Sequence, residues 1–127
     1  MILPDTSIWI EFFRLKPGVQ PDLKREIDRQ NVVAVECVFG ELFQGAKGTR
    51  ERTILREYWV NLPKRDEAGL WIEAGLRSAR EKWFAKGVGL IDAFLIAFAE
   101  KHRLKIWTLD KKLAAVLSAD LRFLAET

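Results

Sequence analysis

Cysteine and histidine are almost absent from this sequence. Its 127 residues include one cysteine, Cys37, and one histidine, His102. A single cysteine excludes a disulfide within the chain. One residue of each type also argues against a closed zinc site, which takes four ligands drawn mostly from these two. His102 has no evident partner for a catalytic triad, and its place near a helix end favours a structural role.

Long apolar runs and flexible linkers are missing as well. No run approaches the roughly 20 apolar residues that a membrane-spanning helix needs. The opening segment, Met1 to Asp5, lacks the basic start and apolar stretch of a signal peptide. No Ser/Gly-rich linker or repeat divides the chain. We therefore expect residues 1–127 to form one domain, in the cytoplasm and away from membranes.

The charges are nearly balanced, with 21 Lys and Arg residues against 18 Asp and Glu residues and a net charge of +3. Such mild basicity suits a polyanionic partner without requiring one. Basic residues recur from Arg50 to Arg56 and from Arg77 to Lys86, where they would attract an RNA backbone. Acidic residues are interspersed among them, so solvated helix faces explain both stretches better.

Four short runs have the pattern of strands, with helical patterns between them. The runs are Ile2 to Pro4, Asn31 to Val35, Lys105 to Thr108 and Leu121 to Leu124. Apolar residues recur at helical spacing from Asp66 to Lys86 and from Leu90 to His102. Strands alternating with helices predict an α/β sandwich with a mostly parallel sheet. Ligands of such sheets bind just beyond the carboxyl ends of the strands.

Two acidic residues stand at the ends of strand-like runs. Asp5 directly follows Ile2 to Pro4, and Asp110 closes the segment that contains Thr108. Each also stands where an aspartate commonly caps the next helix. If the two strands are neighbours, both carboxylates lie at the same edge of the sheet. This shared position at the edge of the sheet favours a functional role for both residues.

Two further acidic residues lie among apolar neighbours. Asp92 opens an apolar helical segment, where burying an unpaired carboxylate is costly unless a cation or a cap partner is present. The helix dipole is the alternative explanation of its position. Glu41 lies inside a helical segment, whereas nearby Glu36 stands at its start, where an acid is ordinary. We favour a site role for Asp92 and Glu41, with a solvent-facing Glu41 as the alternative.

Four carboxylates brought together repel one another and raise each other's pKa. A hard divalent cation removes this penalty, and Mg²⁺ and Mn²⁺ both prefer oxygen ligands. A bound metal lowers the pKa of a water ligand and offsets charge on an attacked phosphate. The sequence therefore predicts a Mg²⁺ or Mn²⁺ site suited to phosphodiester cleavage. Its ligands would be Asp5, Glu41, Asp92 and Asp110.

These acids and their neighbours resemble the PIN domain, and within it the VapC-type toxins of bacterial and archaeal toxin–antitoxin pairs. The match extends over essentially the whole chain. Any one matching segment is weak evidence for this family, but the ordered set of segments at this spacing is strong evidence. The segments are Ile2-Leu3-Pro4-Asp5-Thr6-Ser7-Ile8-Trp9-Ile10, Glu41-Leu42-Phe43-Gln44-Gly45-Ala46, Leu90-Ile91-Asp92-Ala93-Phe94-Leu95-Ile96-Ala97 and Trp107-Thr108-Leu109-Asp110.

The resemblance implies a fold, an activity and partners. The fold would be a three-layer sandwich, with a parallel sheet of four or five strands flanked by helices. The activity would be divalent-metal-dependent endoribonuclease action on RNA. The partners would be a second copy of the chain, as a homodimer, and an antitoxin whose C-terminal segment lies over the active site. By resemblance, the metal-binding and catalytic residues are Asp5, Glu41, Asp92 and Asp110.

Three polar residues match positions that usually line the PIN site, namely Thr6, Ser7 and Thr108. Helix capping and strand-end hydrogen bonding are equal alternatives for them. The chain departs from the family pattern at Lys112, where many relatives carry a further acid, and this puts a second metal in doubt. Glu36 also stands where relatives more often have a small polar residue.

Aromatic residues are numerous, with five tryptophans. Aromatic rings stack on single-stranded bases, but most lie within apolar patterns, and core or interface packing is the better explanation. Trp9, Phe12 and Phe13 near the first helix would line a groove for an antitoxin helix. Ordinary core packing explains these three equally well.

Two other functions fit the sequence less well than a ribonuclease. A PIN-like module that binds RNA or protein without catalysis would not need all four acids. A phosphatase of the haloacid dehalogenase type would need a second aspartate where Ser7 stands. A response-regulator receiver would need an acid pair before its first helix, and that pair is missing.

Overall fold

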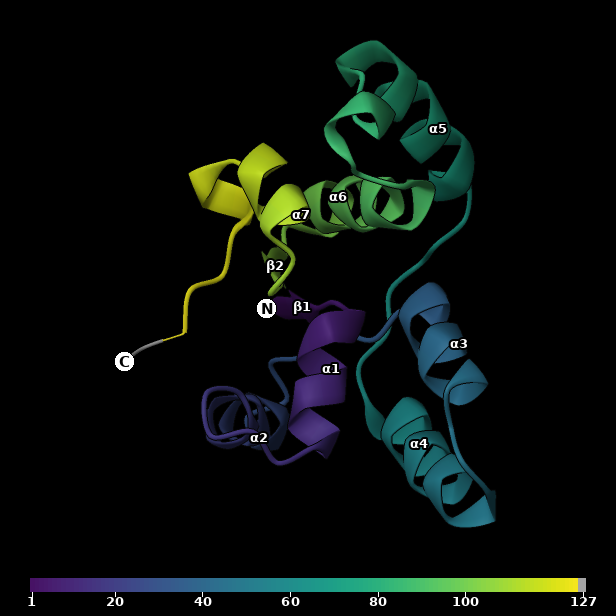
Figure 1. The fold of residues 1–127 in the computed structure, drawn as a ribbon, viewed down its shortest axis with the longest axis vertical. Helices are drawn as coiled ribbons and strands as arrows, with labels where there is room; N and C mark the ends of the chain where they lie inside the picture. Colours follow the sequence, from purple (N-terminus) through teal and green to yellow (C-terminus); the bar gives the residue numbers. More distant parts are fainter. Residues whose placement is uncertain (126–127) are drawn as a thin grey trace.

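Two short parallel strands run through the middle of the molecule. In the computed structural model, which describes residues 1–125, β1 (Ile2–Pro4) pairs with β2 (Lys105–Trp107). Leu3 lies opposite Ile106, and both side chains are fully buried. Such continuous apolar runs are typical of strands that helices cover on both faces. Figure 1 shows the strands between an upper and a lower group of helices.

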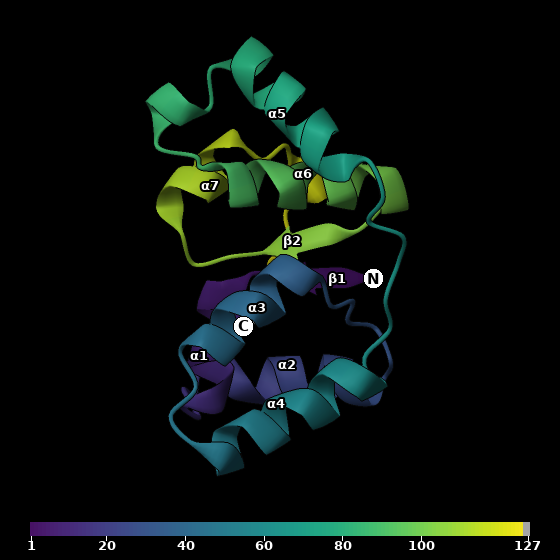
Figure 2. The ribbon, with the colours of Figure 1, turned by 90° about the vertical axis from the view of Figure 1, so that its right-hand side faces the viewer.

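Helices form the two outer layers. Figure 2 shows α1 to α4 on one side of the strands and α5 to α7 on the other. This arrangement confirms the predicted α/β fold with a parallel sheet. In chain order the elements are α1 (Thr6–Phe13), α2 (Gln20–Asp28), α3 (Glu36–Gln44), α4 (Thr49–Asn61), α5 (Leu70–Glu81), η1 (Phe84–Lys86), α6 (Leu90–His102), α7 (Lys111–Val116) and η2 (Ala119–Leu121), where η marks a 3-10 turn.

The sheet is narrower than predicted, and the expectation of four or five strands was wrong. Within residues 1–125 the sheet has two strands, and each of the two outer runs contributes one bridge. Val32 bridges to Ile2, and Arg122 bridges to Ile106, both in parallel. The outer run beside β1 bonds to it only through Ile2, and Pro4, which would donate next in register, has no backbone N–H. β1 itself is short because the chain turns into α1 directly after Pro4.

Helix α6 has the bounds that its apolar pattern predicted, Leu90 to His102. All seven residues from Ala93 to Ala99 are buried. The helix packs against both α5 and β2. A helix that is apolar on every side is stable only when it is covered on every side. This packing holds the first turn of α6, and with it Asp92, in a defined place.

The helical pattern from Asp66 to Lys86 forms a shorter helix than it predicted. α5 begins at Leu70 and ends at Glu81, because Lys82 adopts a left-handed conformation with φ of 57°. A second short turn, η1, follows before Gly87. The only histidine, His102, forms a hydrogen bond of 2.8 Å from its Nε2 to the backbone oxygen of Asp66. His102 therefore ties the end of α6 to the segment before α5.

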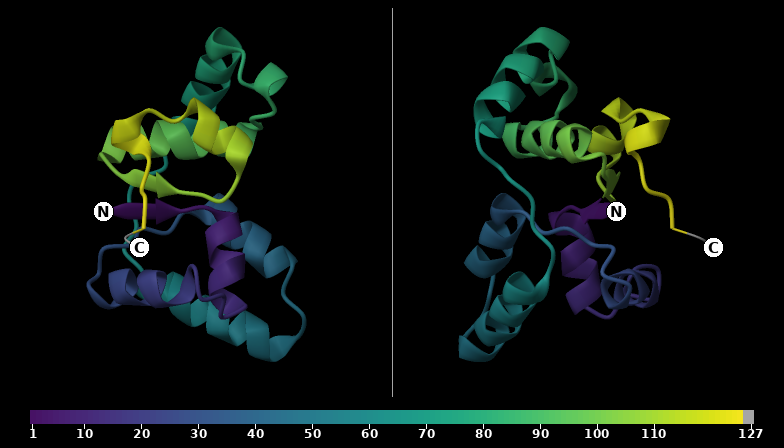
Figure 3. Two further views of the ribbon diagram at one scale, coloured as in Figure 1. Left: turned by 60° about the vertical axis from the view of Figure 1, so that its left-hand side comes forward. Right: turned by 180° about the vertical axis from the view of Figure 1, so that it is seen from behind.

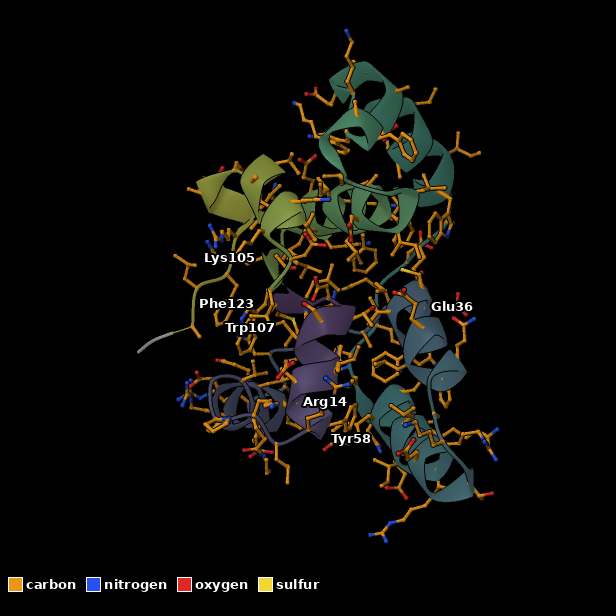
Figure 4. The ribbon with its side chains drawn as sticks, in the orientation of Figure 1. Arg14, Glu36, Tyr58, Lys105, Trp107 and Phe123 are labelled. Atoms are coloured by element: carbon orange, nitrogen blue, oxygen red, sulfur yellow. The ribbon has the colours of Figure 1, made fainter. Side chains whose placement is uncertain are left out.

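The segment after η2 returns to the strands. Figure 3 shows it running back toward the N-terminus. Phe123 donates its backbone N–H to Ile106 at 2.9 Å, and its ring packs against Trp107 with centroids 4.9 Å apart, as Figure 4 shows. Among the described residues, no helix has the length and apolar character needed to cross a membrane.

Candidate active site

Asp5 is a buried carboxylate at the end of β1. Its side chain is 5% exposed and caps α1, accepting the backbone N–H of Ile8 at 3.2 Å. It also accepts the Ser7 hydroxyl at 2.5 Å and, through Oδ2, the Thr108 hydroxyl. Burial raises the pKa of Asp5, and these hydrogen bonds offset part of that rise. Capping does not exclude a site role, because a carboxylate that accepts a backbone N–H through one oxygen still has lone pairs to offer a cation.

Two hydroxyl groups join the carboxyl ends of the strands. Thr108 donates its hydroxyl to Asp5 while accepting the backbone N–H of Asp110 at 2.9 Å. Ser7 donates to Asp5 and accepts the backbone N–H of Leu109 at 3.1 Å. The sequence suggested both residues as site-lining or strand-end groups, and the structure shows the second role directly. The links fix the two acidic strand ends relative to each other.

Asp110 and Glu41 are exposed carboxylates at the rim of the same region. Asp110 caps α7, and its Oδ1 accepts the backbone N–H groups of Lys112 at 2.8 Å and Leu113 at 3.2 Å. Glu41, on α3, accepts the Thr6 hydroxyl at 2.6 Å through Oε1. Although exposed, Glu41 is directed toward the start of α1.

Asp92 shows that the four acids influence one another. It lies half-buried in the first turn of α6, with a pKa raised from 3.8 to about 6. Burial is the largest cause, followed by the negative charges of Asp110, Asp5 and Glu41, in that order. These residues lie on four different elements, yet all act on one carboxylate. Glu36, by contrast, is exposed at the start of α3, and Figure 4 shows it on the outer side of that helix.

The donor set is suited to a hard cation, although the acids are not drawn together around a point. Within residues 1–125, no three Asp, Glu, His or Cys side chains are close enough to form a ready-made metal site. The available donors are carboxylate and hydroxyl oxygens, which Mg²⁺ and Mn²⁺ prefer and zinc sites rarely use alone.

Residues 2–117 match the family model of the PIN domain. The chain belongs to the PIN domain family. The match confirms the resemblance carried by the four acidic segments, and PIN domains are in general nucleases that use divalent metals. A solved toxin–antitoxin complex from Klebsiella pneumoniae has a similar fold, with a TM-score of 0.67 and 21% sequence identity. The alignment covers 97% of this chain and 100% of that one. No curated protein matches the sequence.

The PIN domain also has a groove beside the acids that the sequence located only in part. The groove has a volume of about 510 Å³ and lies between α1, α3 and α4. Phe13 and Arg14 line it, but Trp9 and Phe12 are buried in the core, at 0% and 5% exposure. Figure 4 shows Arg14 at the end of α1 near Tyr58 of α4. Glu41 lines the groove as well, so this residue belongs both to the groove and to the set of four acids.

Proposed function

We propose that this PIN domain is a divalent-metal-dependent endoribonuclease and the toxin of a type II toxin–antitoxin pair. The observation that carries the proposal is the link through Thr108 that joins Asp5 and Asp110 at neighbouring strand ends, where the charges of both act on Asp92. A chain gains nothing for stability by gathering like charges at a partly buried position. Such an arrangement is typical of a site whose function needs the charges.

Asp5, Glu41, Asp92 and Asp110 would hold Mg²⁺ or Mn²⁺. A metal bound there would make a water more acidic and offset negative charge on the attacked phosphate. Asp5 cannot rotate freely, because the Ser7 and Thr108 hydroxyls and the Ile8 N–H all donate to it. Thr6 orients Glu41 in the same way. These contacts prepare oxygen donors in fixed directions, which reduces the cost of ordering them when the metal and RNA bind.

The groove supports an antitoxin as a partner. An occupant of the groove between α1, α3 and α4 would contact Glu41 directly and so disturb one of the acids. Apolar groups from Ile10, Phe13 and Ile54 offer a seat for an amphipathic segment, and Arg14 and Lys47 offer charges for acidic groups on it. Co-expression with the protein encoded by the neighbouring reading frame should give a stable complex in which RNA cleavage is suppressed.

The proposed activity is tested by replacing Asp92 with asparagine, which keeps the shape and removes the charge. We expect Asp92→Asn to lower the rate of RNA cleavage by at least about 100-fold, since a lost metal ligand removes several kcal/mol of transition-state stabilisation. Glu36→Gln is the matched control, because Glu36 is exposed at the start of α3, and its rate should be unchanged.

Circular dichroism should show the same helix content in all three proteins. Cleavage by the wild-type chain should also stop when EDTA removes the metal. Cleavage that persists in excess EDTA, or in Asp92→Asn, would contradict the proposal.

A further inference from the structure

A second cavity, of about 560 Å³, lies between η1 and α7. Its lining includes none of the four acids. The elements that line it, η1 and α7, lie on the same side of the strands as α6, as Figure 2 shows, and the first turn of α6 carries Asp92. The residues that line it are Glu81, Trp83, Lys86, Lys111, Lys112, Ala115 and Val116. Three of these are lysines, and one is acidic.

The positive charge in this cavity is not neutralised by the protein. Within the described part of the chain, none of Lys86, Lys111 and Lys112 forms an ion pair. Glu81, the single acid of the lining, is within 4.0 Å of Arg80 instead. Ammonium groups gathered in a cavity without counter-charges attract anions from solution.

The side chain of one of these lysines, Lys112, lies directly against Gly87. Gly87 has a φ of +81°, and a Cβ there would lie 2.6 Å from Cδ and 3.3 Å from Nζ of Lys112. The Lys112 side chain therefore lies across the glycine, in space that any other residue would fill. The backbone N–H of Lys112 also donates to Oδ1 of Asp110 at 2.8 Å. Lys112 thus connects the cavity with the rim of the carboxylate site.

We propose that this cavity binds a phosphate of the RNA strand, on the side of the carboxylate site where α7 begins. The inference rests on the proposed nuclease function and adds a subsite to it. A strand that reaches the acids brings its phosphates close to four carboxylates, which repel them. Lysines next to Asp110 offset this repulsion and hold the strand in place. Lysine ammonium groups bind phosphate as point charges, without the planar geometry that arginine needs.

The experiment measures RNA binding as a function of salt. The variant is Lys86→Gln/Lys112→Gln, which keeps most of each side chain and removes both charges. Its control is Lys16→Gln/Lys24→Gln, two exposed lysines near α2 on the opposite side of the strands. Fluorescence anisotropy reports the Kd of a labelled 12-nucleotide single-stranded RNA from 50 to 300 mM NaCl, in EDTA so that the RNA stays intact.

Each phosphate of a single strand that a lysine neutralises adds about 0.7 to the steepness of log K against log salt. Because the cavity would neutralise one phosphate, we expect the cavity variant to have a slope shallower by about 0.7, and the control variant to match the wild type. An unchanged slope and Kd in the cavity variant would overturn the proposal and favour an acidic protein segment as the ligand of the cavity.

The failure of this subsite and the failure of the nuclease proposal give different results. If RNA is cleaved in Mg²⁺ but the slopes agree, the nuclease proposal stands and the phosphate subsite is wrong. If no cleavage occurs but the slope changes as expected, the phosphate subsite is right and the nuclease proposal is wrong. The protein then binds RNA without cutting it. All proteins in the series keep the four acids unchanged.

Discussion

At the scale of single residues, Asp92 and Asp5 differ in what stabilises the charge of a partly buried carboxylate. Asp92 is more easily protonated in the folded chain than in the unfolded chain, because burial and three negative neighbours disfavour its charge. Asp5 is buried more deeply, but hydroxyl and backbone N–H donors stabilise its charge in part. Without a metal, hydrogen bonds therefore stabilise the charge of Asp5, and they do not do so for Asp92.

This difference predicts how stability changes with pH. The pKa of Asp92 is about 6 in the folded chain and 3.8 as the ordinary value, so the folded state binds more protons between these two pH values. Stability contributed by this group is then present below pH 4 and lost as the pH rises to about 6. Compared with Asp92→Asn, the wild type in EDTA should lose about 1–3 kcal/mol of unfolding free energy across this range.

Urea unfolding of both proteins from pH 4 to 7 measures the difference. If the two curves of stability against pH are parallel, the acids do not influence Asp92 as described. Addition of Mg²⁺ at pH 7 should restore more of the lost stability to the wild type than to the variant, because only the wild type carries the Asp92 charge for the cation to offset.

The sequence predicted the places of Asp5 and Asp110 at strand ends, and β1 and β2 are indeed neighbours. Local pattern was sufficient for this, because Asp5 directly follows β1 and Asp110 comes three residues after the end of β2. The hydrogen bond from Thr6 to Glu41 was not predictable, since it joins residues 35 positions apart and depends on how α1 packs against α3. The second cavity was not predictable for the same reason, although Lys86 belonged to a basic stretch that the sequence analysis named. Lys86 and Lys112 are brought together only by the fold.

At the scale of elements, helices were predicted better than strands. The bounds of α6 follow from its apolar pattern, because a helix forms all its backbone hydrogen bonds within one segment. A strand depends on its neighbours, and the two outer runs had the right composition but only one bridging residue each. The pairing along β1 stops where Pro4, which has no backbone N–H, would have to donate to the outer run.

The junction between η1 and α6 gives a prediction at this scale. Gly87→Ala should destabilise the protein by about 1–2 kcal/mol, because an alanine is strained in the left-handed conformation. The added Cβ should also push aside the flexible end of Lys112. Gly75→Ala is the matched control, since Gly75 lies within α5 with open space around it and should be stabilised by about 0.5–1 kcal/mol. Thermal unfolding measures both, and equal stability of the two variants would contradict this description of the junction.

At the scale of the whole molecule, the helical layers leave apolar side chains on the surface. Ile72 and Leu76 are one turn apart on α5 and are 73% and 64% exposed, and Phe84 of η1 is 84% exposed. Exposed apolar groups of this size are typical of surfaces that contact another protein. We predict that α5 is the contact surface of the homodimer that the PIN resemblance implies.

Light scattering after size exclusion tests this assignment. The wild-type chain should have the mass of a dimer, and Leu76→Asp should shift it to the monomer, because a buried aspartate without a partner is costly at an interface. Val60→Asp changes an equally exposed apolar residue of α4, 71% exposed, and should leave the dimer intact. A wild-type monomer, or a dimer that survives Leu76→Asp, would contradict the assignment.

The central claim is that four carboxylates from separate elements form one cation site. Isothermal titration of Mn²⁺ into the wild-type chain and into Asp92→Asn at pH 7.5 tests it most directly. We expect a saturable heat in the wild type and a loss of at least about 10-fold in affinity, which is 1.4 kcal/mol, in the variant. No binding by the wild type, or equal binding by both proteins, would show that these acids do not act together.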